Sequence, residues 1–272
     1  MQPTLKGDGA MDMIGLGLLA SLLAGMATGV GALPILFFRH IPARLVNTML
    51  GAAAGVMLAA TSFSLIVPGI DYGNALWPGL GVYVVIVGML IGALFLDRVD
   101  NWLPHEHFAI NKDGTTSTGK EGPASHLKRV WLFIIAITIH NFPEGLAVGV
   151  GFGTGDIGGG TSLAIGIGIQ NMPEGLAVAL PLIGLGYSRG KAIGYATMTG
   201  LVEPIGGVLG VGAVTIFQQV LPIGLAFAAG AMLFVISDEI IPETHAKGKS
   251  RSATFGVLVG FVVMMALDNL LG

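Results

Sequence analysis

Eight long stretches of this chain contain few or no charged residues, and no other feature limits its possible folds as strongly. They cover residues 13–38, 45–70, 72–96, 130–153, 161–187, 192–217, 221–241 and 253–271. The first three contain no Asp, Glu, Lys or Arg, and the next three contain a single Glu each. A bilayer core about 30 Å thick needs roughly 20 apolar residues per helix. Each stretch is therefore long enough to cross a membrane as a helix.

The composition agrees with a membrane protein. Of the 272 residues, 53 % are hydrophobic and only 11 % are charged, whereas soluble domains contain about 25 % charged residues. We therefore predict an all-α integral membrane protein in which residues 1–272 form a single transporter domain with eight transmembrane helices. These helices leave no room for a separate catalytic or nucleic-acid-binding domain. The lipid bilayer is an expected partner, and nucleic acid is not.

Positive charges gather on one side of the predicted bundle. The connections after the first, third, fifth and seventh helices hold every Lys and Arg except Lys6. Because such connections favour the cytoplasm, both termini are expected outside it. The long polar connection, residues 97–127, would then be cytoplasmic. His105 and His107 in this loop, with His126 further on, are either weak metal-capture residues or ordinary solvated histidines.

A repeated motif lies in the fourth and fifth stretches. HNFPEGLAV at 140–148 and QNMPEGLAV at 170–178 are identical at seven of nine positions. Each copy is near the middle of its stretch, and consecutive membrane helices run antiparallel. The two copies are therefore predicted to meet as an inverted pair at the centre of the bilayer, where transporters often place their binding site.

Helix geometry places the polar residues of each copy together. His140 and Glu144 are four residues apart and share a face, while Asn141 is three residues before Glu144. Pro143 has no N–H, so it frees a backbone carbonyl and predicts a kink beside these side chains. The second copy repeats the arrangement with Gln170, Asn171, Pro173 and Glu174. A third intramembrane carboxylate, Glu203, comes directly before a proline.

Three carboxylates inside a membrane need a partner. Insertion scales assign about 2.5 to 3.5 kcal/mol to a mid-helix Asp or Lys, so three unpaired carboxylates would cost on the order of 8 to 10 kcal/mol. No Lys or Arg lies within these stretches. One alternative is that the glutamates are protonated and hydrogen-bonded within kinked helices. A bound cation is the simpler explanation.

The residue types narrow the choice of cation. Carboxylate and amide oxygens alone would suit Mg²⁺, Ca²⁺ or Mn²⁺, but the imidazole of His140 shifts the preference toward Zn²⁺, Fe²⁺, Co²⁺ or Ni²⁺. The chain has no cysteine, which excludes a thiolate site of the kind that holds structural zinc. Oxygen-rich ligands that exchange readily suit transport.

At these residues the chain resembles the ZIP (Zrt/Irt-like) family of divalent metal transporters, in its bacterial GufA-like branch. HNFPEG resembles the helix 4 signature of the family and QNMPEG its helix 5 signature, and the predicted eight-helix layout covers the whole chain. The resemblance implies a multi-pass protein of a bacterial inner membrane, the plasma membrane, that transports metal into the cytoplasm. Zinc is the expected ion, with cadmium, iron and manganese as alternatives because Gln170 stands where many members have His.

The resemblance also implies a binuclear centre between the fourth and fifth helices. Carried over by position, the first metal would use His140, Glu144, Gln170 and Glu174. The second would use Asn141, Asn171 and Glu203, with Glu144 and Glu174 able to bridge. Met57 either offers a thioether to the first metal or belongs to ordinary packing.

Further polar residues mark a possible path. Ser64, Asp71 and Asp268 approach the outer side of the predicted bundle, and Asp238, Glu239 and His245 the inner side. For Asp71 and Asp268, a plain solvated helix end explains the residues equally well. A second copy of the chain is a candidate partner.

Two other functions compete with metal transport. Two inverted half-elements with Asn and Pro also describe channels for small neutral solutes, although such a pore gains nothing from carboxylates. An intramembrane metallohydrolase could use zinc on His140 and Glu144 to activate water. However, the chain has no H-E-x-x-H pattern, and a motif repeated on two helices suits an ion site better. The protein is therefore not expected to be an enzyme.

Overall fold

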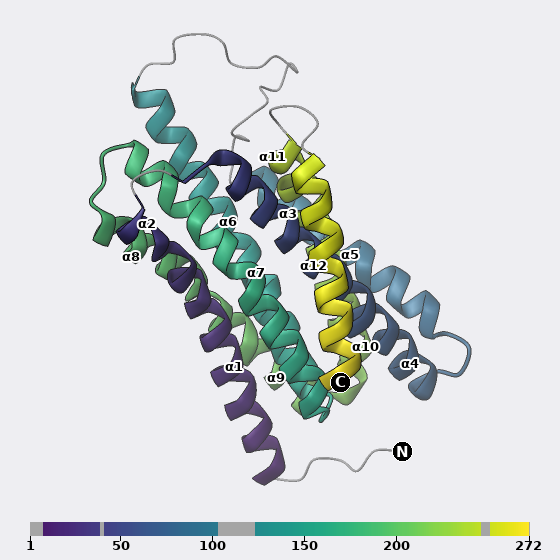
Figure 1. The fold of residues 1–272 in the computed structure, drawn as a ribbon. Coiled ribbons are helices and arrows are strands. Elements are labelled where there is room, and N and C mark those ends of the chain that lie inside the picture. Colours follow the sequence, from purple (N-terminus) through teal and green to yellow (C-terminus); the bar gives the residue numbers. More distant parts are fainter. Residues whose placement is uncertain (1–7, 39–40, 103–122, 246–250, 272) are drawn as a thin grey trace.

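A computed structural model describes residues 8–38, 41–102, 123–245 and 251–271. Within these ranges the chain is helical and has no β-strand (Figure 1). Eight helical segments of the described chain are long and apolar enough to cross a membrane. The all-α, eight-span fold class predicted from the sequence is confirmed.

The first three spans contain several short elements. They comprise α1 (Asp8–Ala32) with α2 (Pro34–Phe37), then α3 (Ala43–Ala59), the π-helix η1 (Ala60–Ile66) and α4 (Val67–Leu76), and finally α5 (Gly81–Trp102). The fourth and fifth spans are single helices, α6 (Pro123–Gly153) and α7 (Ile157–Gly184). The last three comprise α8 (Arg189–Gly200) and α9 (Glu203–Ile216), the 3-10 helix η2 (Gln218–Val220), α10 (Leu221–Val235), the π-helix η3 (Ile236–Ile240), α11 (Ile241–His245) and α12 (Arg251–Leu271).

Two predicted boundaries differ from the observed ones. The second span continues through Asp71 to Leu76, and the chain turns at residues 77–80, where Gly79 adopts a φ of 78°. Glycine tolerates this conformation, whereas Asp71 is a helical residue despite its charge. The connection expected over 97–127 is helical at both ends, because α5 continues to Trp102 and α6 begins at Pro123. Charged residues do not end a helix when they lie beyond the apolar core.

The sixth span is interrupted at its carboxylate. The sequence predicted one helix over 192–217, but α8 ends at Gly200 and α9 begins at Glu203. Pro204 lacks an N–H and therefore suits the first turn of a new helix, where that group has no intrahelical partner. By contrast, α6 and α7 remain helical through Pro143 and Pro173. The kinks expected at these two prolines stay predictions.

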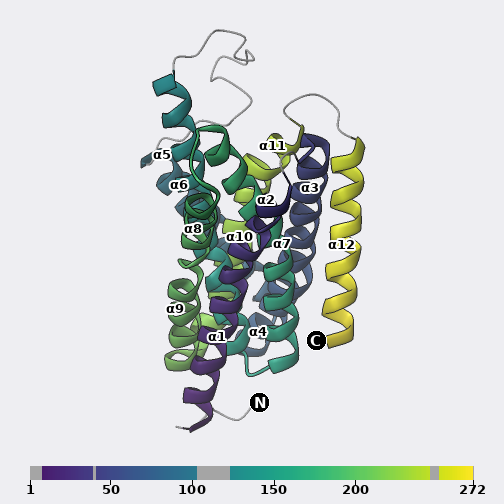
Figure 2. The ribbon, with the colours of Figure 1, turned by 60° about the vertical axis from the view of Figure 1, so that its left-hand side comes forward.

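The two motif-bearing helices lie in the middle of the bundle. α6 packs against α9 and α10, and α7 packs against α1 and α3, while α5 covers α10 and α12 covers α3 (Figure 2). Sixty-seven per cent of the most apolar window of α6 and of α7 is buried, compared with 22 % for α5 and 17 % for α12. The fold therefore encloses α6 and α7 and leaves α5 and α12 to face lipid.

The two ends of the described chain lie at the same end of the bundle. The start of α1 and the end of α12 are found there, and α2 and α11 lie at the opposite end (Figures 1 and 2). An even number of spans returns the chain to the side on which it began. The observed arrangement therefore gives the two faces of the bundle different sets of connections.

Candidate metal centre

Seven polar side chains of the two motif copies and the sixth span meet in the interior. They are His140, Asn141 and Glu144 on α6, Gln170, Asn171 and Glu174 on α7, and Glu203 at the first turn of α9. None is more than 3 % exposed. Because α6 and α7 occupy the middle of the bundle, the polar cluster lies deep within an otherwise apolar protein.

The cluster is joined by contacts between different helices. Gln170 Nε2 on α7 donates a hydrogen bond of 2.6 Å to Glu144 Oε1 on α6. A second contact joins the same two helices, because His140 Nε2 on α6 lies 3.8 Å from Glu174 Oε2 on α7. Asn171 Nδ2 donates a 2.6 Å hydrogen bond to Glu203 Oε1. Each carboxylate of the cluster therefore faces a polar side chain from another helix.

Many buried oxygen atoms of the cluster remain without a donor. Among the described residues, no hydrogen bond reaches Glu144 Oε2, Glu203 Oε2, either carboxylate oxygen of Glu174, Gln170 Oε1, Asn141 Oδ1 or Asn171 Oδ1. A buried acceptor without a partner costs about 1 to 3 kcal/mol, and more when it is charged. A divalent cation can satisfy several such oxygens at once. The donor set, mostly carboxylate and amide oxygen with one imidazole, fits a borderline transition metal.

The cluster differs from a closed structural metal site. In the described ranges, no three His, Asp or Glu side chains converge closely enough to hold one ion by themselves. An ion bound here would therefore also need the amide oxygens of Asn141, Gln170 or Asn171. Such mixed, weaker ligands suit an ion that must leave again.

The glycine of each motif brings another helix close to the cluster. A Cβ atom on Gly145 would overlap the backbone of Glu203, and one on Gly175 would overlap the backbone of Thr28 on α1. Glycine is required at both positions because two backbones approach without room for a methyl group. The first copy is therefore packed against the third carboxylate, and the second copy against α1.

The structure also locates the residues that were predicted around the centre. Met57 is fully buried on α3, in the apolar cluster that also contains Ile167 of α7. Ser64 in η1 donates a 2.6 Å hydrogen bond to Asp268 on α12, and both are half-buried. Asp71 is exposed on α4. Ser64 and Asp268 thus form a polar pair, and Asp71 stands apart on the surface.

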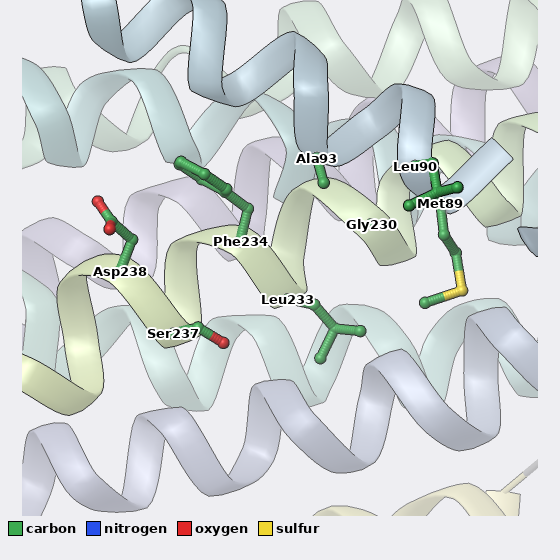
Figure 3. A pocket seen from close by; sticks show the side chains of 8 residues that line it. All are labelled: Met89, Leu90, Ala93, Gly230, Leu233, Phe234, Ser237 and Asp238. Carbon is green, nitrogen blue, oxygen red and sulfur yellow. The ribbon is translucent and has the colours of Figure 1, made fainter. Parts of the chain in front are cut away.

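Asp238 lies in a pocket of about 370 Å³ between α5 and the seventh span. Met89 and Leu90 lie toward one end of this pocket, and Ser237 and Asp238 lie toward the other (Figure 3). The side chains of Glu239 and His245 and the whole of His105 and His107 fall outside what the structure describes. Their proposed roles therefore stay predictions.

One group in contact with the cluster was not predicted. Asn171 Nδ2 donates a second hydrogen bond, of 2.8 Å, to the backbone carbonyl of Ala24 on α1. A backbone carbonyl has no signature in the sequence, since every residue has one. The glycines of α1 were visible, but glycines fit any tightly packed membrane bundle.

Comparison with known proteins places these features in a family. A family model described as "ZIP Zinc transporter" matches residues 103–268, which is more than half of the chain. The chain belongs to the ZIP family. The resemblance seen in the two motif copies is thereby confirmed.

Several ZIP relatives are similar over almost the whole chain. Zinc transporter ZIPB from Bordetella bronchiseptica is 46 % identical, over 95 % of this chain and 82 % of the relative. Zinc transporter GufA from Myxococcus xanthus is 44 % identical, over 95 % of this chain and all of the relative. Zinc transporter ZIP11 from Homo sapiens is 36 % identical, over 94 % of this chain and 97 % of the relative. The GufA-like branch is confirmed, and a transporter of this family is not an enzyme, which removes the metallohydrolase alternative.

Proposed function

We propose that this protein carries zinc ions across a membrane through the cluster formed by α6, α7 and the start of α9. The observation that carries the proposal is the group of three buried carboxylates, Glu144, Glu174 and Glu203, with no hydrogen-bond donor for most of their oxygens among the described residues. The names of the ZIP relatives supply the ion, because each is called a zinc transporter.

The cluster would hold two ions in neighbouring positions. The first position takes His140, Glu144, Gln170 and Glu174 as ligands, and Met57 as an added thioether. The second takes Asn141, Asn171 and Glu203, while Glu144 and Glu174 bridge. In support, each free oxygen named above belongs to one of these side chains. Sharing two carboxylates between two ions lets one ion weaken the hold on the other, which favours release.

The ligand types leave room for other ions. Only one imidazole is present, and the remaining ligands are oxygen atoms that also suit Mn²⁺ and Fe²⁺. Cadmium, iron and manganese are therefore secondary substrates in this proposal. Competition of each ion against zinc in the uptake assay would rank them.

The chain is proposed to be a single transporter domain of a bacterial inner membrane, with both termini outside and uptake into the cytoplasm. The distribution of Lys and Arg supports this orientation. Ser64, Asp71 and Asp268 would then lie on the outer side of the path, and Asp238, Glu239 and His245 on the inner side. A homodimer is part of the proposal, and sedimentation in detergent would test it.

Uptake into vesicles tests the proposed function directly. Purified protein in liposomes that enclose a zinc-sensitive dye should give zinc influx above that of empty liposomes. Glu174→Ala should remove this influx, because it deletes a ligand of both positions. Asp12→Asn, which alters an exposed carboxylate at the start of α1, is the matched control and should leave influx unchanged. If wild-type protein gives no influx of any divalent ion, the proposed function is wrong.

A further inference from the structure

The amide of Asn171 is fixed by two acceptors from two different helices. Its Nδ2 donates to the carbonyl of Ala24 on α1 at 2.8 Å and to Glu203 Oε1 on α9 at 2.6 Å. An amide nitrogen has two N–H groups, so both are used. Turning the amide over would place its oxygen against two other oxygens, which repel it. The orientation of Asn171 is therefore determined, and its Oδ1 is left as a buried acceptor without a donor in the described chain.

The carbonyl of Ala24 is held in place by the contact between α1 and α8. A Cβ atom on Gly25 would overlap the carbonyl of Gly200 and would lie 3.4 Å from Cβ of Glu203. From the opposite side, a Cβ atom on Gly200 would overlap the carbonyl of Gly25. The two backbones therefore touch at the level of the cluster. Any added atom at either glycine must push α1 away from α8 and so shift the carbonyl of Ala24 relative to Asn171.

In the described chain, the side chain through which α1 is hydrogen-bonded to the cluster is Asn171. The bond from Gln170 to Glu144 joins α7 to α6 and does not involve α1. The bonds of Asn171, by contrast, connect α1 and α9 to the side chains that were assigned to the second metal position. A displacement of α1 should therefore act on that position first.

We propose that α1 is a positioning element for the second metal position: the carbonyl of Ala24 orients Asn171 so that its Oδ1 faces the ion. The inference rests on the proposed function, because it requires two metal positions. Ala24 itself touches no metal in this proposal. Its effect passes through Asn171 and depends on how closely α1 packs on α8.

Alanine substitution of single glycines tests the inference. Gly25→Ala and Gly200→Ala force α1 and α8 apart, and each should weaken metal binding at the second position at least about tenfold. The first position should stay within about twofold of wild type. Gly15→Ala on α1 and Gly194→Ala on α8 are matched controls, because a Cβ atom at either position meets no other group within 4 Å.

The measurement must separate the two positions. Titration of the purified protein with ¹¹³Cd²⁺, followed by cadmium NMR, gives one resonance per position and an affinity for each. General loss of stability would weaken both resonances together, whereas the positioning role weakens only one. If Gly25→Ala and Gly200→Ala do not fold, Gly29→Ala provides a milder change, since the three atoms nearest to its Cβ would all belong to the side chain of Thr197 and not to a backbone.

The outcomes distinguish this inference from the proposed function. Selective loss of the second position in any of these variants that folds supports it. Equal weakening of both positions, or unchanged binding in every variant that folds, overturns it. If wild-type protein binds fewer than two Cd²⁺ ions, the two-position proposal itself fails. Two ions in wild type and two undiminished ions in every one of these variants that folds would leave that proposal intact and reject only the role of α1.

Discussion

The two copies of the motif share seven of nine residues, yet they have different neighbours. The copy on α6 presents Gly145 to the backbone of Glu203, so a third carboxylate lies beside it. The copy on α7 presents Gly175 to Thr28 on α1, a helix with no charged residue near that point. The same short sequence therefore meets a carboxylate in one copy and a neutral backbone in the other.

The amide side chains show the same contrast. Neither polar atom of Asn141 has a hydrogen-bond partner in the described chain, whereas Asn171 donates twice. An internal repeat thus fixes which residues can be ligands, but the surrounding helices decide how each is oriented. Inverted repeats in a transporter need not give two equivalent halves of a site.

The largest expected effect concerns the shared carboxylates. If the two copies form one centre, Glu144→Ala and Glu174→Ala should each lower zinc uptake about 100-fold or more. Mutating a residue that only supports a metal ligand already lowers metal affinity or activity by up to about 100-fold, and these two residues are ligands in the proposal. Uptake by reconstituted vesicles at matched protein content measures this. Asp12→Asn serves as the control.

Different uptake by Glu144→Ala and Glu174→Ala would show that the two copies have different roles. Near-normal uptake by Glu174→Ala, with uptake lost in Glu144→Ala, would mean that only the copy on α6 holds metal. The binuclear proposal would then be wrong, although transport itself could remain.

Acidity should affect the two positions differently. Metal binding needs a neutral imidazole and ionised carboxylates, so protons compete with metal for both positions. Only the first position has an imidazole, and a free imidazole gains its proton near pH 6.5. Affinity at the first position should therefore fall about tenfold more than at the second as pH drops from 7 to 5, with one further proton displaced per ion.

Calorimetry in buffers of different ionisation heat counts these displaced protons. The double variant His105→Asn and His107→Asn is the matched control, because it removes the loop histidines and leaves the centre intact. Affinity that does not change with pH would exclude the imidazole and carboxylates as ligands.

A smaller effect, on stability, is expected from substituting the glycine through which each copy contacts its neighbouring helix. Gly145→Ala and Gly175→Ala each insert a methyl group between touching backbones, which should lower the free energy of unfolding by about 1 to 3 kcal/mol. Gly212→Ala on α9, where a Cβ atom has open space, is the control. Unfolding in mixed detergent measures the difference. If Gly145→Ala and Gly175→Ala unfold with the same free energy as Gly212→Ala, the close backbone contacts at these two glycines are not needed for stability.

The smallest effect tests the one ligand difference between the copies. Gln170→His gives the copy on α7 the same polar side chains as the copy on α6 and supplies a second imidazole, which zinc prefers to an amide oxygen. Zinc affinity should rise by about tenfold, or about 1.4 kcal/mol. Gln219→His, at an exposed position in η2, is the control. No gain in Gln170→His over this control would argue against Gln170 as a ligand.

The fold class could be read from the sequence because membrane spans depend on length and polarity alone. Eight stretches with few or no charged residues correspond to eight spans in the described chain. The repeat at 140–148 and 170–178 identified six of the seven polar side chains that the structure brings together. Where boundaries depended on turn geometry, prediction was less accurate. The predicted spans 45–70 and 72–96 meet at Asp71, but the helix continues through this residue to Leu76 and the chain turns at Gly79, which can adopt a positive φ.

The rest could not be predicted because it depends on contacts between distant segments. The break between Gly200 and Glu203 required knowing that a proline sits at a helix start and not inside one. The bond from Asn171 to Ala24 depends on which helix packs against α7, and one sequence without its fold does not contain that information.

The contact between Gly25 and Gly200 also sets a sequence of events during biosynthesis. The first helix leaves the ribosome long before Gly200 does, so the two surfaces meet only after six spans have been made. Until then, the growing chain holds Glu144 and Glu174 in the bilayer without Glu203. A nascent chain halted before the sixth span should therefore lack a complete centre, and loading with metal should follow, not guide, insertion of the earlier helices.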